Sequence, residues 1–93
     1  MTEYILNEYI LIAENSINIA PDCGSVRIMD EILKSLKIIV NERKTPTTKK
    51  DLRILRYNIE NVFTGRFITP KTQKVQENVI VAVAMAQDYI HTI

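Results

Sequence analysis

The longest apolar run of the chain, VIVAVAMA at residues 79–86, fits two kinds of secondary structure. Alternation would place every second residue on one side of a buried strand, and the same run also fits a helix that is buried on more than one face. The flanking residues decide between the two. Thr69-Pro70 is an N-cap followed by a proline at the first helical position, and neither glycine nor proline occurs after it. The pattern therefore predicts a helix over residues 70–91.

Three earlier segments repeat apolar residues at helical spacing, and loop signals at residues 20–25, 45–48 and 64–70 separate them. We predict helices over 3–19, 26–44 and 49–64, the last followed by Gly65 as a natural C′ residue. The fold class is all-α: residues 1–93 form one domain, an up-down four-helix bundle with short loops. The stripes expected to face the core are Leu6, Tyr9, Ile10, Ala13 and Ile17 in the first helix, Met29, Ile32, Leu33, Leu36, Ile39 and Val40 in the second, and Leu52, Leu55, Ile59, Val62 and Phe63 in the third.

The fourth predicted helix has more apolar residues than one core stripe needs. At 100° per residue its core stripe consists of Val75, Val79, Ala82, Val83, Ala86, Ile90 and Ile93. Four further apolar residues lie outside this stripe, among polar neighbours: Ile80, Val81, Ala84 and Met85. Either neighbouring helices cover more of this helix than usual, or a second copy of the chain packs on it. We expect a homo-oligomer, a dimer or larger, with these four residues at the interface.

Charge is unevenly distributed along the chain, although the total is only +1. Residues 1–42 carry seven acids and three bases, whereas residues 43–74 carry nine bases and two acids. Beside Tyr57, the third predicted helix presents a basic face, which Lys71 extends. Such a face can bind phosphate groups, an acidic protein including the acidic half of a neighbouring copy, or only water. The near-neutral total charge is unlike that of a dedicated nucleic-acid binder. The residues of this basic face are Lys49, Lys50, Arg53, Arg56 and Lys71.

Residues that carry catalytic or metal chemistry are scarce. His91 is the single histidine and Cys23 the single cysteine, so clustered zinc ligands and an internal disulfide are both excluded. Two glycines, Gly24 and Gly65, are too few for a phosphate-binding loop. We therefore predict a protein that is not an enzyme and binds neither a cofactor nor a metal. The lone cysteine, the start of the chain and the lack of a long apolar run predict a cytoplasmic protein outside the membrane.

The segment Pro21-Asp22-Cys23-Gly24-Ser25-Val26-Arg27-Ile28-Met29-Asp30 resembles a small all-helical prokaryotic family of unknown function. The resemblance implies the all-helical fold and brings no activity with it. Cys23 stands where an aromatic residue is expected. Pro21 and Gly24 are expected to shape a tight turn between helices. Arg27 is then within reach of acids three and four residues on, as a surface ion pair or as an anion-binding residue beside helix N-terminal amides.

These observations predict a non-enzymatic structural or interaction module that self-associates through its fourth helix. The alternative is a protein that binds nucleic acid or another polyanion through the basic 43–74 region. A small-ligand site at the Arg27–Asp30 corner is a remote third possibility.

Overall fold

The structure is a computed structural model that describes residues 3–21, 23–42, 48–61 and 70–91, with the side chains of Pro70, Lys71 and His91 left out. These residues form four helices: α1 (Glu3–Ile19), α2 (Gly24–Asn41), α3 (Thr48–Asn61) and α4 (Pro70–His91). The all-α fold class is confirmed. The bounds of α1 and α4 are those predicted. α2 begins two residues before its predicted start and α3 one residue before. α2 ends at Asn41 with Glu42 as its C-cap, earlier than predicted, and the rest of both predicted last turns lies in undescribed residues.

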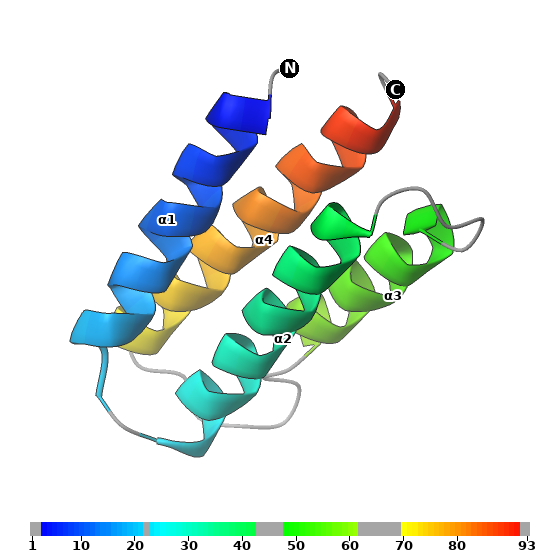
Figure 1. Cartoon of the computed structure of the whole chain (residues 1–93). Helices are drawn as coiled ribbons and strands as arrows, with labels where there is room; N and C mark the ends of the chain where they lie inside the picture. The colour runs from blue at the N-terminus through cyan, green and yellow to red at the C-terminus, as the bar shows by residue number, and fades with distance from the viewer. Residues whose placement is uncertain (1–2, 22, 43–47, 62–69, 92–93) are drawn as a thin grey trace.

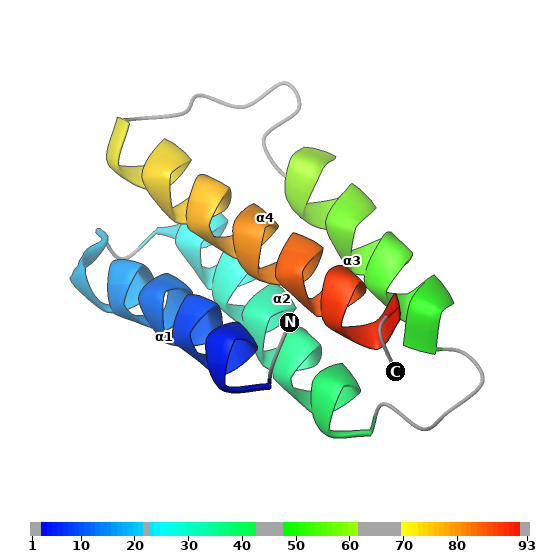
Figure 2. The same cartoon turned by 90° about the horizontal axis from the view of Figure 1, so that it is seen from above.

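Successive helices run in opposite directions, so the bundle is up-down (Figure 1). Short connections favour this arrangement because they leave neighbouring helices antiparallel. α2 and α4 contact each other and both of the other helices. Within the described residues α1 and α3 do not contact one another, and Figure 2 shows them on opposite sides of the α2–α4 pair. α1 and α3 are therefore the two flanking helices of the bundle.

The core lies between the four helices and consists largely of the predicted apolar stripes. Leu6, Leu33, Leu36, Leu52 and Val79 are among its fully buried side chains. Tyr9, Ile17 and Ile39 are half-buried, which is less than their stripes predicted. Val62, Phe63 and Ile93 lie outside the described residues. The stripes missed the buried residues Val26 and Tyr89.

The central position of α4 accounts for part of its apolar excess. Because three helices surround α4, the covered arc is wider than the single stripe that packing against one neighbour would produce. Ile80 and Met85 are half-buried and pack against the core, and Ala84 is half-buried as well. Of the four predicted interface residues, Val81 is the most open to solvent, at 37% exposed. Part of what the sequence assigned to a second copy is thus supplied by the chain itself.

The connection from α1 to α2 does not depend on a glycine. Cys23 precedes α2 in extended backbone, and the Arg27 amide donates to the Cys23 carbonyl at 3.1 Å. Gly24 already belongs to α2, its backbone is not in the left-handed region, and a Cβ there would meet no atom within 4 Å. The prediction that Gly24 shapes a tight turn is therefore wrong.

In the part of the chain that the structure describes, none of the helices combines the length and the apolar content that crossing a bilayer requires.

Candidate functional site

The outer face of α1 is apolar although it does not face the core. Leu6, Ile10 and Ala13 fill the inner face, and five large apolar side chains remain exposed on the rest of the helix. Ile5, Ile12 and Ile19 are spaced seven residues apart, and Tyr4 and Leu11 share that spacing, so each set recurs every two turns on one side. Their exposed fractions are 72% for Tyr4, 41% for Ile5, 54% for Leu11, 51% for Ile12 and 86% for Ile19. We call these five residues the α1 outer face.

The charges on α1 are all acidic. Glu3, Glu8 and Glu14 are the charged residues of the helix, and Lys and Arg do not occur in the chain before Arg27. Glu14 pairs with Lys37 of α2 at 2.6 Å. Glu8 accepts a hydrogen bond from the Tyr4 phenol, and this bond together with the negative charge of Glu8 raises the pKa of Tyr4 above its usual value. The α1 outer face therefore combines exposed apolar side chains with a carboxylate beside them.

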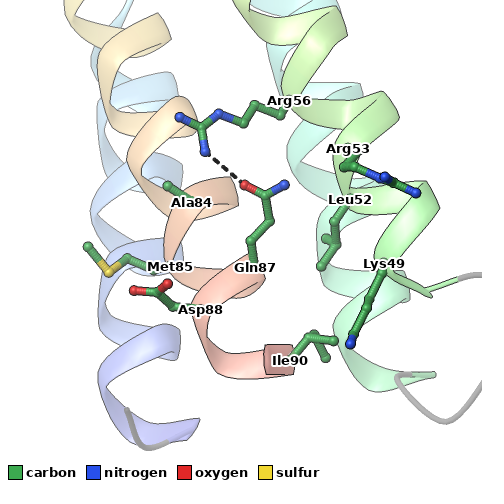
Figure 3. Close-up of a pocket in the computed structure, with 9 residues that line it drawn as sticks. All are labelled: Lys49, Leu52, Arg53, Arg56, Ala84, Met85, Gln87, Asp88 and Ile90. Carbon is green, nitrogen blue, oxygen red and sulfur yellow. Dashed lines mark hydrogen bonds between the residues drawn. The ribbon is translucent and has the colours of Figure 1, made fainter. Parts of the chain in front are cut away.

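A second surface feature is a groove between α3 and α4 of about 540 Å³ (Figure 3). Its apolar lining comes from both helices, and its charged residues are three cations of α3 and one acid of α4. The lining residues are Lys49, Leu52, Arg53 and Arg56 of α3, and Ala84, Met85, Gln87, Asp88 and Ile90 of α4. We call this feature the α3–α4 groove. It brings together three residues of the predicted basic face and two of the predicted helix-four interface, which the sequence treated as separate sites.

Two of the groove cations differ in how they are held. Arg56 extends across to α4, where its Nη1 donates to Gln87 Oε1 at 2.9 Å (Figure 3). Its Nε donates to Glu60 Oε1 of α3 at 3.0 Å. Within the described residues Arg53 makes no ion pair, and its guanidinium is turned away from α4 at the outer rim. Exposed side chains of this kind change rotamer within nanoseconds, so Arg53 can still reach a partner in the groove. Arg56 thus links α3 to α4 across the groove, whereas the guanidinium of Arg53 is available to an incoming partner at the edge of the groove.

Lys49 is the third groove cation. Its side chain extends along α3 to the Ile90 end of the groove (Figure 3), and it too makes no ion pair in the described part of the chain. A hydrogen bond from Gln76 Nε2 to the Ile59 carbonyl, at 2.9 Å, joins the same two helices further along. Both walls of the groove are thus tied together by side chains that cross from one helix to the other.

The remaining residues of the basic face are not in the groove. Lys50 is exposed on α3 and does not line it, and Tyr57 is exposed beside α2, at the edge of a smaller hollow of about 380 Å³. The side chain of Lys71 lies outside the described residues. The structure therefore divides the predicted basic face between the groove and the outer side of α3.

Of the two residues of the predicted Arg27–Asp30 corner, Asp30 lines a hollow between α1 and α2. Asp30 pairs with Lys34 at 3.1 Å, one turn along α2. Arg27 is exposed and has an interaction of its own, but it lines none of the three hollows described, the third of which is about 240 Å³ and lies between α1 and α2. The small-ligand site at this corner stays a prediction.

Among the described residues, three or more His, Cys, Asp or Glu side chains do not come together in a way that would hold a metal ion. Buried side-chain nitrogen and oxygen atoms in these residues all have hydrogen-bond partners. The two candidate sites that remain are both on the surface, the α1 outer face and the α3–α4 groove.

Sequence reasoning missed the α1 outer face, although the signal was present. At 100° per residue, Ile5, Ile12 and Ile19 fall together on the side opposite Leu6 and Ile10.

Comparison of the chain with protein-family models, with curated proteins and with solved structures finds no match in any of the three. The resemblance of the Pro21–Asp30 segment to a helical family stays a prediction.

Proposed function

We propose that this chain is a non-enzymatic helical interaction module whose activity is to associate with copies of itself. The observation that supports this most is the α1 outer face, where five large apolar side chains stay exposed on a helix that already fills the core with another face. A helix that serves only the bundle needs polar residues on its solvent side. The cytoplasmic location stays a prediction.

Covering the α1 outer face favours association. Leu11 and Ile12 are each about half exposed, so covering what remains of them contributes roughly 1 kcal/mol per side chain at ordinary transfer values. Five such residues provide several kcal/mol before the cost of ordering two molecules is subtracted. Association costs about 4 kcal/mol or more in lost translational and rotational freedom, so this face favours weak self-association and the surface that it meets must contribute as well.

The seven-residue spacing on α1 supports a helical partner. Ile5, Ile12 and Ile19 recur at the interval by which one helix follows the surface of another. The interface that the sequence predicted on α4 contributes to this proposal through Ala84 and Met85, which line the α3–α4 groove, and through Val81 on the open side of the helix.

Sedimentation velocity over a wide concentration range tests the proposal. The wild-type chain is expected to shift from monomer to larger species as concentration rises, and the double variant Leu11→Lys with Ile12→Lys is expected to stay monomeric. Both positions are about half exposed, so the fold should tolerate lysine there. A matched control is Ile38→Lys, which makes the same chemical change on the exposed side of α2. A wild-type chain that is monomeric at every concentration would refute the proposal.

A second candidate function, binding of nucleic acid or another polyanion, is favoured by one arrangement. Arg53 lies about one turn and Lys50 about two turns before the exposed Tyr57 on α3, and cations near an exposed aromatic ring suit a phosphate backbone and an unstacked base. A fluorescence-anisotropy titration with single-stranded DNA and RNA at two salt concentrations tests it. Binding that weakens with salt and is lost in Lys50→Glu would support it, and no binding at low salt would remove it.

A further inference from the structure

The α3–α4 groove has the chemistry of a site for an acidic amphipathic helix. Apolar side chains, Leu52, Ala84 and Ile90 among them, line it, and cations of α3 occupy its rim. Its volume of about 540 Å³ is enough to take several side chains of a ligand rather than a single one. Grooves of this form bind a helix by accepting apolar residues one and two turns apart, while charges at the edge set its position.

The α1 outer face has the complementary properties. Leu11 and Ile12 are adjacent exposed apolar side chains, and Glu8 lies about one turn before them on the same helix. α1 carries acids and no base, whereas the charged residues that line the groove are three cations and one acid. Bringing α1 to the groove therefore joins opposite charges around an apolar contact.

Pairing α1 with the α1 of another copy is a weaker solution. It would cover the same apolar side chains, but it would bring together two helices whose charged residues are all acidic. Like charges across an interface disfavour association, and opposite charges both favour it and fix its register. The difference in charge between α1 and the groove is what distinguishes the two arrangements.

We infer that the α3–α4 groove of one molecule receives the α1 outer face of a second copy, with Leu11 and Ile12 over the apolar lining and Glu8 beside Lys49 or Arg53. The inference rests on the proposed self-association and names the two surfaces that meet. The contact joins two different surfaces. Each surface can therefore be removed by its own variant while the other surface stays intact.

A complementation experiment uses this property. The first variant, Leu11→Lys with Ile12→Lys, loses the α1 outer face and keeps the groove. The second, Lys49→Glu with Arg53→Glu, loses the groove cations and keeps α1. Each is expected to associate at least about tenfold more weakly than the wild type. An equimolar mixture is expected to form a one-to-one complex, because the intact α1 of the second variant meets the intact groove of the first. Sedimentation velocity and native mass spectrometry measure the species.

The control for charge is Lys34→Glu with Lys50→Glu, which reverses two exposed cations outside the groove and is expected to associate like the wild type. Circular dichroism checks that every variant is helical. The milder pair Lys49→Gln with Arg53→Gln gives the same readout with a smaller change in charge.

The outcomes separate the two proposals. If the groove variant associates as strongly as the wild type, or if the mixture forms no complex, the groove inference is overturned while self-association stands. Failure of the wild-type chain to associate at all would overturn both. A complex in the mixture, with neither variant associating alone, supports the inference, since a contact between two α1 helices cannot produce it.

Discussion

α1 and α3 occupy equivalent positions in the bundle and have opposite surfaces. Each packs against both α2 and α4, and each fills the core with a narrow apolar stripe that includes a fully buried leucine, Leu6 in α1 and Leu52 in α3. Their solvent sides differ. α1 presents apolar side chains and acids, whereas α3 presents cations along one side.

This difference shows where the information about function lies in a small bundle. The position of a flanking helix fixes the chemistry of its inner face, because that face must be apolar to be buried. It places no such demand on the outer face. The exposed apolar residues of α1 and the cations of α3 are therefore not explained by the fold, and they are the features for which an interaction is the physical reason.

The largest expected effect tests the equivalence of the two inner faces. Leu6→Ala and Leu52→Ala should each lower the free energy of unfolding by about 2–5 kcal/mol, because each removes a fully buried side chain and leaves a cavity. Urea unfolding followed by circular dichroism measures the loss. A cost near zero at one of the two positions would show that the flanking helices are not equivalent in the core.

The next effect sharpens the contrast between the outer faces. Raising NaCl from about 50 mM to 500 mM should weaken self-association roughly five- to tenfold, because screening over a few ångströms reduces the attraction between Glu8 and the groove cations. Sedimentation equilibrium at several salt concentrations measures this. Association that is unchanged or strengthened by salt would instead indicate an apolar contact between two α1 helices.

A smaller difference is expected between two side-chain interactions, one that links α3 to α4 and one that links α1 to α2. Gln76→Ala removes the half-buried hydrogen bond to the Ile59 carbonyl of α3 and should cost about 1 kcal/mol. Lys37→Ala removes the largely exposed pair with Glu14 of α1 and should cost less than about 0.5 kcal/mol. Thermal unfolding of both variants measures the difference. Equal losses would mean that exposure does not weaken the Lys37–Glu14 pair.

The smallest effect concerns Gly24, which follows the connection from α1. Gly24→Ala should stabilise the chain by about 0.4–1 kcal/mol, because the backbone there is open to any residue and alanine has fewer unfolded conformations to lose. A higher midpoint in urea would confirm it. Destabilisation would show that the turn needs glycine after all.

Much of the fold could be predicted because helix start signals and stripes are local. Pro70 marks the first residue of α4, and the described residues of its predicted stripe, from Val75 to Ile90, are all buried. The partner of the additional apolar residues of α4 was harder to predict. Angles show which residues share a side, but they do not show how many helices surround it, so Ile80 and Met85 were assigned to a second copy although the chain itself partly covers them.

The candidate site was less accessible to sequence reasoning. Arg56 and Gln87 are 31 residues apart, and their hydrogen bond depends on which helices lie side by side. The basic face and Ala84 were each found from local spacing, but only the packing of α3 against α4 places them in one groove. The α1 outer face needs no such information, because its residues recur at helical spacing within a single helix.

The diagonal placement of α1 and α3 determines how an assembly grows. Because the two helices lie on opposite sides of the α2–α4 pair, a molecule cannot cover its own groove with its own α1. In the proposed contact every molecule therefore uses its α1 outer face on one side and its α3–α4 groove on the other. A row of molecules then has a free α1 outer face at one end and a free groove at the other. Such a row continues as a filament unless its geometry closes it into a ring. A molecule that lacks only one of the two surfaces still adds to one end and then blocks it, so a small fraction of either double variant should lower the mean length of wild-type rows.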